Sequence, residues 1–380
     1  MFGLLIGRSK PLLVIGSCHL DIFADQIISD GESGGDIKVK GQILIAAGGS
    51  GFNVAMSLAL NKEKVELYTK MNPWYIGRPA ITTELRASGV KSQIDYDRSI
   101  DSYFFIAHRS RHDGRLDIDK AIANDGIISP TMSGTKLRKL IRRSRGVVLC
   151  CNYPTSELRL VIDECRTFSR PLFMCGVGEQ LVTRISDIRD KLIGLSNFEL
   201  LSLDRGEAIR LVESFTRGRR VPKWTQCSEL AMEILTELGC EAVSISDGPQ
   251  GVRLFMKSAK EIVLTSPDVP IIESTTGAGD ACFAALVAHI AAGETFDAGH
   301  ETMSQKVDRF IRPVLRSPYA NTSRAYFHSE RESNPKQLQV IEHRIRIRER
   351  WFAVWLMLGG TAAGAALGAA ATLLLQRWII

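Results

Sequence analysis

The sequence Ser274-Thr275-Thr276-Gly277-Ala278-Gly279-Asp280 runs directly into the small-residue segment 281–288. A glycine-rich turn that opens a helix directs free backbone N–H groups and the positive end of the helix dipole at one point, which suits a phosphate. A carboxylate there would repel a phosphate unless it had a chemical task. The task that fits is to accept the proton of a hydroxyl that attacks the phosphate. The stretch therefore predicts phosphoryl transfer, with Asp280 as the general base.

The composition is that of a globular protein. Of the 380 residues, 45% are hydrophobic and 24% are charged, and the formal net charge is +6. The clearest basic run, Arg344 to Arg350, favours a membrane surface over nucleic acid as a partner. The cysteines show neither zinc-type pairs nor the density of a disulfide scaffold, so we expect reduced, buried thiols.

The C-terminal segment predicts a membrane anchor. Residues 351–376 are long and apolar enough to cross a bilayer as a helix, with tryptophans near both ends. Arginines precede this span and only Arg377 follows it, which places the N-terminal bulk in the cytoplasm. Residues 316–350 would form a polar, then basic, stalk. The alternative is a core helix of a soluble protein.

Three glycines of this segment lie four residues apart, at Gly360, Gly364 and Gly368. The spacing permits close helix packing in lipid, and so a homodimer through the anchor. The high frequency of glycine in membrane helices explains the same pattern equally well.

Alternating strand and helix patterns predict an α/β fold with a mostly parallel central sheet and helices on both faces. The first strand covers 12–17, and further strands are expected at 65–70, 103–107, 146–150, 171–174, 198–203 and 242–246, with a return strand at 252–256. Helices are expected at 80–88, 135–145, 156–167, 281–292 and 300–315. Short alternating runs within about 30–47 predict a small β flap, and 109–119 reads as a polar loop.

Two segments near the N-terminus carry the expected substrate contacts. Asp21 follows the first strand, where open α/β sheets bind ligands, although an aspartate that merely begins a turn would look the same. The glycine turn 48–51 leads into a helix that begins near Asn53, whose amide could bind hydroxyls. A dinucleotide fingerprint is rejected here, because Val54 occupies the position of its third glycine.

Asp204 and Glu207 allow two interpretations. A capping acid followed by Glu three residues later is a capping box, which explains both residues structurally. The functional interpretation is that the two carboxylates hold waters around Mg²⁺. The turn 247–251, close to the main loop if successive strands are neighbours, could lie over a nucleotide.

Residues 11–315 resemble the PfkB or ribokinase-like family of carbohydrate and nucleoside kinases. The stretch 275–280 is similar to the C-terminal signature of that family, and Gly48-Gly49-Ser50-Gly51-Phe52-Asn53-Val54-Ala55 is similar to its N-terminal signature. Segments 16–21 and 246–251 match the sugar-contact and nucleotide-side segments. Segments 122–125 and 149–154 look most like the pseudouridine-kinase branch.

The resemblance implies a role for each matching position. The catalytic group would be Asp280 as base, with Gly277, Ala278 and Gly279 around the anion hole. The substrate side would be formed by His19, Asp21, Gly49, Asn53 and Asn152. The nucleotide side would be formed by Ser246, Gly248, Gly251 and Thr276. Glu207 and Asp204 would hold Mg²⁺ through water, and ATP would donate the phosphate.

Three positions depart from the family pattern. Ser274 replaces an acid near which the family can bind a monovalent cation, Asp204 replaces an Asn, and His19 replaces an Asn beside the sugar. The sequence therefore predicts a membrane-anchored, ATP- and Mg²⁺-dependent kinase for a hydroxymethyl group of a ribose-like sugar or nucleoside, with pseudouridine as a candidate. The alternative is an anchored sensor that keeps the pocket but catalyses poorly.

Overall fold

The computed structural model describes residues 9–26, 41–100, 103–112, 115–123, 134–216, 222–223, 226–258, 260–267, 269, 272, 275–294 and 300–317. The chain divides into two compact units, Met1–Tyr326 and Phe327–Ile380. Within the described ranges no helix has the length and apolar character needed to cross a membrane. The expected anchor at 351–376, its glycines, and all of the stalk beyond Ser317 lie outside these ranges, as does Ser274.

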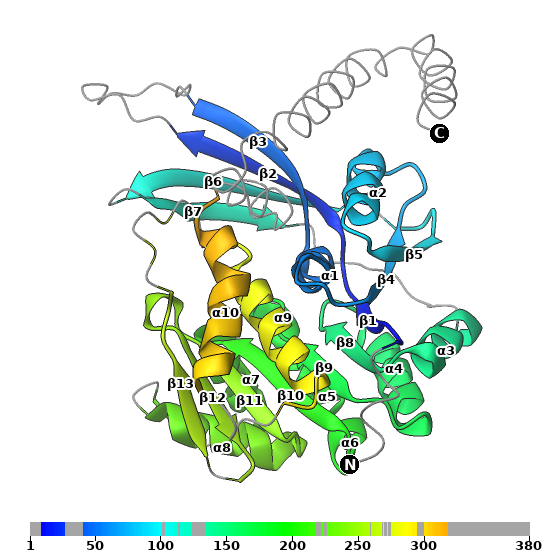
Figure 1. The fold of residues 1–380 in the computed structure, drawn as a ribbon, viewed down its shortest axis with the longest axis vertical. Coiled ribbons are helices and arrows are strands. Elements are labelled where there is room, and N and C mark those ends of the chain that lie inside the picture. The colour runs from blue at the N-terminus through cyan, green and yellow to red at the C-terminus, as the bar shows by residue number, and fades with distance from the viewer. Residues whose placement is uncertain are drawn as a thin grey trace. The chain divides into compact units, whose positions relative to one another are not determined.

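A nine-stranded sheet forms the centre of the first unit (Figure 1). Its order is β13-β12-β11-β10-β9-β8-β1-β4-β5. The parallel strands are β1 (Leu12–Ile15), β4 (Val65–Met71), β5 (Lys91–Tyr96), β8 (Gly146–Cys150), β9 (Leu172–Cys175), β10 (Phe198–Asp204) and β11 (Ala242–Ser246). Two antiparallel strands, β12 (Val252–Met256) and β13 (Glu261–Leu264), complete one edge. The predicted mostly parallel sheet is confirmed.

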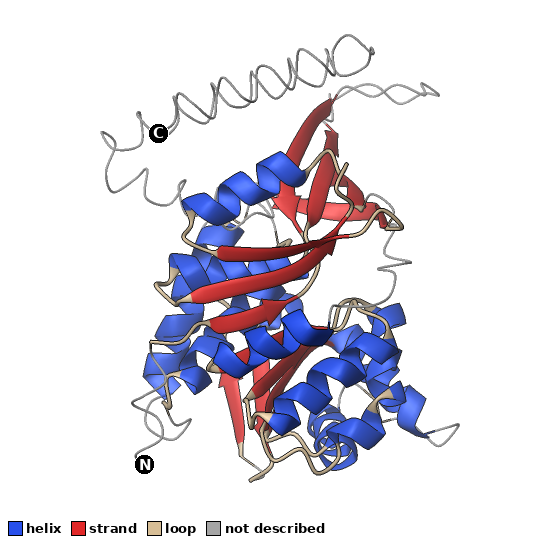
Figure 2. Cartoon of the chain, turned by 90° about the vertical axis from the view of Figure 1, so that its right-hand side faces the viewer, coloured by secondary structure: helices blue, strands red, loops and turns tan. Residues whose placement is uncertain are grey.

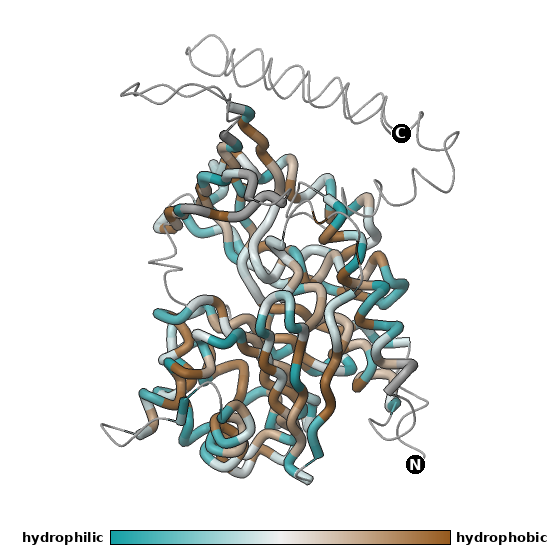
Figure 3. The backbone as a smooth tube through the Cα atoms, turned by 90° about the vertical axis from the view of Figure 1, so that its left-hand side faces the viewer, coloured by the Kyte–Doolittle hydropathy of each residue, from teal (hydrophilic) through white to brown (hydrophobic). Residues whose placement is uncertain are grey.

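Helices cover both faces of the sheet (Figure 2). One face carries α1 (Ser50–Leu60), α2 (Arg78–Ala87), α9 (Ala278–Ala291) and α10 (His300–Leu315). The other face carries α3 (Gly134–Arg143), α4 (Thr155–Thr167), α5 (Glu179–Asp187), α6 (Arg189–Leu192), α7 (Arg205–Thr216) and α8 (Cys227–Leu238). The neighbouring strands β1 and β8 are accordingly apolar along their length. Figure 3 shows hydrophobic stretches of this kind, coloured brown, in the interior of the chain.

The central strand β1 shows how the two cores are built. All four of its residues are fully buried, and Leu12 and Val14 point into one core while Leu13 and Ile15 point into the other. A strand that is buried on both faces needs apolar residues at every position, and this is why the sequence predicted it correctly.

A second sheet of four strands forms the flap. Its order is β3-β2-β6-β7, from β2 (His19–Gln26), β3 (Gly41–Gly48), β6 (Phe104–His112) and β7 (Arg115–Ala123). The flap is therefore larger than the segment 30–47 that we expected, and the part of that segment before Gly41 lies outside the described residues. The predicted polar loop at 109–119 is wrong, since most of it belongs to the hairpin of β6 and β7.

A buried ion pair explains why this hairpin was missed. Arg109 is completely buried, and its Nε and Nη2 donate to the two carboxylate oxygens of Asp25 at 2.7 and 2.9 Å. Its guanidinium also lies over the ring of Phe23, at 4.1 Å from the ring centre. A strand whose inward residue is arginine lacks the apolar alternation on which the prediction depended.

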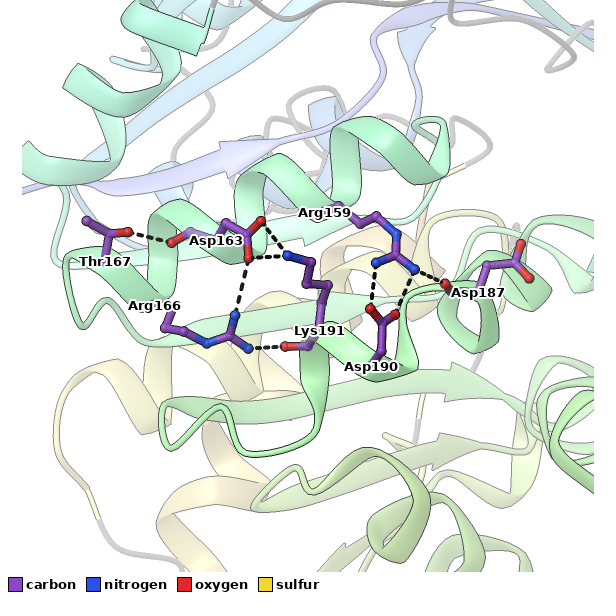
Figure 4. Close-up of polar contacts among 7 residues, drawn as sticks. All are labelled: Arg159, Asp163, Arg166, Thr167, Asp187, Asp190 and Lys191. Atoms are coloured by element: carbon purple, nitrogen blue, oxygen red, sulfur yellow. Dashed lines mark hydrogen bonds and ion pairs between the residues drawn. The ribbon is translucent and has the colours of Figure 1, made fainter.

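Ion pairs at the surface join α4 to α6 (Figure 4). Arg159 forks onto Asp190 with both Nη atoms at 2.7 Å, and Lys191 contacts Asp163 at 2.9 Å. These contacts fix the outer helical layer. They provide positions for control substitutions that leave the site untouched.

Candidate active site

The site begins where the end of β1 meets the start of α1. A Cβ atom at Gly16 would lie 2.6 Å from the Cα of Gly51, so only glycine at both positions allows the two backbones to touch. The amide of Phe52 then donates to the carbonyl of Ser17 at 3.1 Å. This close crossing directs Asn53, on the first turn of α1, at the carboxyl edge of the sheet.

Asn53 and Asp280 come together at this edge. Nδ2 of Asn53 donates to Oδ2 of Asp280 at 2.9 Å. Asp280 lies in the first turn of α9, which begins after Gly277 in a left-handed conformation with φ of 81°. That conformation is easily accessible to glycine, and it turns the helix start toward the site.

The amides at the start of α9 differ in their availability. The amide of Ala278, which was expected in the anion hole, donates to the carbonyl of Thr275 at 3.1 Å. The amides of Gly279 and Asp280 have no partner among the described residues. The backbone donors that this turn could offer to an anion are therefore those of Gly279 and Asp280, at the positive end of the helix dipole.

Burial raises the pKa of Asp280 to about 6, although the residue keeps some solvent exposure. The hydrogen bond from Asn53 opposes this rise, the negative charge of Asp21 adds to it, and His19 opposes it. A carboxylate with a pKa near 6 is a better proton acceptor than an ordinary aspartate and is still ionised at neutral pH. These properties fit a general base.

The substrate side is formed by the start of the flap. Nε2 of His19 lies 3.2 Å from Oδ1 of Asp21, and both residues are on β2. Two glycines make room for them: a Cβ at Gly48 would lie 2.1 Å from Oδ2 of Asp21, and a Cβ at Gly49 would lie 3.0 Å from Nδ1 of His19. His19 and Asp21 also influence Asp280 electrostatically, so these predicted residues share one site.

Oδ1 of Asp21 has Nε2 of His19 as a neighbour at 3.2 Å but makes no hydrogen bond, and two more buried polar atoms of this site have no hydrogen-bond partner among the described residues. They are Oδ1 of Asn53 and Nδ1 of His19. A buried polar atom without a partner costs free energy, and such atoms are rare in native proteins. Both atoms would be satisfied by the hydroxyl groups of a bound substrate.

Asn152 was predicted as a substrate contact, and the structure places it just below the site. In the orientation that satisfies its neighbours, its carboxamide oxygen accepts from the amide and hydroxyl of Ser17, at 3.2 and 2.5 Å. Its nitrogen donates to the carbonyl of Cys150 at 3.1 Å. These hydrogen bonds hold the loop after β1, so Asn152 fixes the position of Ser17.

Asp204 and Glu207 form the predicted capping box. The amide of Glu207 donates to Oδ1 of Asp204 at 2.7 Å, and the amide of Asp204 donates to Oε2 of Glu207 at 2.8 Å. Oε1 of Glu207 accepts from the amide of Gly178 at 2.6 Å. Burial, followed by the charge of Asp204, raises the pKa of Glu207 to about 7, and the charge of Asp280 contributes to the rise.

These carboxylates also fit a hydrated cation. Asp204 is exposed, and its Oδ2 has no partner among the described residues. Burial is the largest cause of the raised pKa of Glu207, and the repulsion by Asp204 that adds to it is a field that a divalent cation would relieve. Mg²⁺ prefers carboxylate oxygens and keeps several waters, which matches one exposed and one buried carboxylate at this edge.

The predicted nucleotide turn follows β11. Ser246 ends that strand, and the residues from Gly248 to Gln250 form an exposed turn of 3₁₀ helix, η2. Gly251 closes it with φ of 90°, where a Cβ would lie 2.1 Å from the carbonyl oxygen of Leu264. The turn thus exposes backbone at the same end of the sheet. Thr276 is partly exposed in the turn before α9.

The sequence did not identify Gly178 and Arg205 as parts of this site. Gly178 acts through its backbone amide, which has no sequence signal of its own. Arg205 lies within the predicted capping box, yet its ion pair with Asp247 depends on strand order.

Comparison with solved structures identifies the fold of the chain. No family model matches the chain, and no curated protein matches it either. Among solved structures, Arabidopsis thaliana ribokinase, determined with ribose and ATP, is 21% identical over 83% of this chain and 95% of that one, with a TM-score of 0.61. The chain has a ribokinase-like fold.

Two further structures agree. A carbohydrate kinase from Agrobacterium tumefaciens is 19% identical over 82% of this chain and 93% of that one, with a TM-score of 0.61. The ribokinase of Giardia lamblia is 15% identical over 83% of this chain and 96% of that one, with the same TM-score of 0.61. The chain therefore spans nearly the whole length of these proteins.

Proposed function

We propose that this protein is an ATP-dependent kinase that phosphorylates a hydroxymethyl group of a ribose-like sugar or nucleoside. The observation that carries the proposal is the position of Asp280. Its carboxylate has a pKa raised to about 6, is bonded to Asn53, and lies one residue from an amide that has no partner among the described residues. A base and an anion site at one helix start suit the attack of a hydroxyl on a phosphate.

The substrate would lie between the flap and α1. Asp21 and His19 on β2, with Asn53 on α1, would bind its hydroxyl groups and direct one of them at Asp280. The two unpartnered atoms of Asn53 and His19 would then be satisfied. Pseudouridine is the first nucleoside to test, because segments 122–125 and 149–154 resemble that branch of the family.

ATP would bind at the turn after β11, with its phosphates directed at the start of α9. Mg²⁺, held through water by Asp204 and Glu207, would neutralise charge that develops on the transferred phosphate. Asp280 itself would accept the proton of the attacking hydroxyl.

The test is ATP turnover with a panel of sugars and nucleosides. We expect Asp280→Asn to lower kcat by roughly 10²- to 10⁴-fold, as loss of a general base does, while nucleotide binding remains. Asp308→Asn is the control, because Asp308 pairs with Arg312 on α10. Undiminished turnover by Asp280→Asn would remove the assigned base.

A second candidate is a sensor that binds the sugar or nucleoside but turns it over poorly. It is favoured by the capping bonds that already engage Asp204 and Glu207, and by the use of the Ala278 amide within its own turn. Calorimetric binding of a nucleoside without turnover in the kinase assay would support the sensor. Turnover at rates of about 1 to 100 per second, the usual range for kinases, would exclude it.

The proposal includes a C-terminal anchor at residues 351–376, with the kinase domain in the cytoplasm. It is supported by the uncharged span and the arginines that precede it. We expect the full chain to sediment with membranes and to resist carbonate extraction. Release by carbonate would instead favour a core helix in a soluble protein.

A further inference from the structure

Arg205 lies at the carboxyl edge of the sheet, directly after the end of β10. Strands β10 and β11 are parallel neighbours in register, and they end side by side with Asp204 opposite Ser246. Arg205 and Asp247 follow these two residues directly. Nη1 of Arg205 lies 3.6 Å from Oδ1 of Asp247. Arg205 therefore joins the strand end that carries Asp204 to the turn assigned to the nucleotide.

Helix stability does not explain this arginine. Arg205 is the first residue of α7, where the helix dipole disfavours a positive charge. Its side chain is 52% exposed, and an exposed ion pair of this length contributes little to stability. Further along the same helix, Arg210 contacts Glu213 at 3.1 Å, with an arginine exposure of 54%. Of these two exposed arginines, Arg205 is the one that lies at the site.

The charges at this edge call for a cation. The charges of Asp204 and Asp280 both act on Glu207, and Asp247 adds a fourth carboxylate at this edge. A polyphosphate that approaches such an edge is repelled unless positive charge accompanies it. One Mg²⁺ offsets only part of the charge of a nucleoside triphosphate. A guanidinium beside the phosphates would offset more, and its fork of donors matches phosphate oxygens.

We infer that Arg205 binds the phosphate groups of a nucleoside triphosphate, and that its guanidinium exchanges Asp247 for phosphate oxygens when the nucleotide enters. The inference deepens the proposed function and rests on it. Arg205 would touch the β- and γ-phosphates from the side of β10, while the amides of Gly279 and Asp280 approach from α9.

Isothermal titration calorimetry tests the contact without any turnover. The ligands are the magnesium complex of a non-hydrolysable ATP analogue and adenosine, which lacks phosphates. We expect Arg205→Gln to weaken binding of the analogue by roughly 10- to 100-fold, as loss of a charge-assisted hydrogen bond does, and to leave adenosine binding unchanged. Arg205→Lys keeps the positive charge without the forked guanidinium donors, and it should lose less affinity for the analogue. Arg210→Gln, on the same helix, should match the wild type with both ligands.

Two results would overturn the inference. Equal binding of the analogue by Arg205→Gln and the wild type would show that Arg205 does not touch the phosphates. An equal loss of affinity for the analogue and for adenosine would show that Arg205 only shapes the turn through Asp247. A wild-type chain that binds neither ligand would overturn the proposed function as well, and this outcome is distinct because the failure lies in the unmodified protein.

Discussion

Asn53 donates a hydrogen bond from Nδ2 to Oδ2 of Asp280 at 2.9 Å, across 227 residues of sequence. The bond joins the first turn of α1 to the first turn of α9, and so ties the substrate side of the site to the phosphate side. It also acts on the chemistry, because it opposes the rise that burial causes in the pKa of Asp280. The position and the basicity of the proposed base thus depend on one neighbour.

Removal of this bond should move the pH dependence of catalysis. Asp280 must be ionised to accept a proton, so kcat/KM of the wild type should fall as the pH drops below about 6. Asn53→Ala removes an interaction that lowers the pKa of Asp280, and the acidic limb should move to higher pH. At the plateau we expect a loss of roughly tenfold or more, because a substrate contact is lost as well. The measurement is a pH profile of kcat/KM.

Asn61→Ala is the matched control for that profile. Asn61 caps the other end of α1, where its Nδ2 donates to the carbonyl of Ser57 at 2.9 Å. Its removal perturbs the same helix without touching Asp280. An acidic limb that stays in place in Asn53→Ala would show that the Asn53 bond does not tune the base.

Glu207 should make the protein less stable as the pH rises. Its pKa is raised from 4.5 to about 7 in the folded protein, with burial as the largest cause. Between these values the folded chain holds a proton that the unfolded chain releases, so the free energy of unfolding falls as the pH increases through this window. The side chain in Glu207→Gln cannot ionise, so this variant does not lose this stability. For the wild type the loss in the free energy of unfolding is about 3 kcal/mol once Glu207 is fully ionised.

Thermal unfolding in EDTA at pH 5 and pH 8 would measure this effect. Glutamine loses one acceptor for a backbone amide, which lowers stability by a similar amount at both pH values. The difference in Tm between Glu207→Gln and the wild type should nevertheless be more favourable to the variant at pH 8. Glu213→Gln, on the exposed side of α7, controls for loss of a carboxylate. A difference that does not change with pH would contradict the prediction.

Gly48 should control the position of Asp21. Its backbone does not require a positive φ, yet a Cβ there would lie 2.1 Å from Oδ2 of Asp21. Gly48→Ala should therefore displace the carboxylate and raise KM for the sugar or nucleoside by roughly tenfold, with little change in nucleotide affinity. Gly134→Ala, where no described residue lies within 4 Å of the added atom, is the control and should be neutral or slightly stabilising. An unchanged KM in Gly48→Ala would argue against Asp21 as a substrate contact.

The sequence predicted best where one local pattern decides the structure. The apolar run of β1 and the capping box of Asp204 and Glu207 each depend on residues within a few positions, and both are present as expected. The same holds for the glycine turn before α9. The use of the Ala278 amide within that turn could not be read from residue types, because it depends on backbone geometry.

Contacts between segments that are far apart in the chain could not be predicted from the sequence. The flap strand β2 carries Asp21 and Asp25, which interrupt the apolar alternation of a half-buried strand. Asp25 is buried because it meets Arg109, 84 residues later, and neither residue alone indicates a strand. The pairing of Arg205 with Asp247 likewise required the order of β10 and β11.

The ion pair of Asp25 and Arg109 should hold the flap together. Arg109→Met fills a similar volume but leaves the carboxylate of Asp25 buried without its bidentate partner, and breaking such a pair costs about 3 to 5 kcal/mol. Because Asp21 lies on the same strand as Asp25, a loosened flap should also raise KM for the sugar or nucleoside. Urea unfolding would measure the loss of stability, and hydrogen exchange of the β2 and β6 amides would locate it. The double variant with Asp25→Leu removes the unpaired charge and should recover part of the loss. Equal stability of the single and double variants would mean that the buried charge is not the cause.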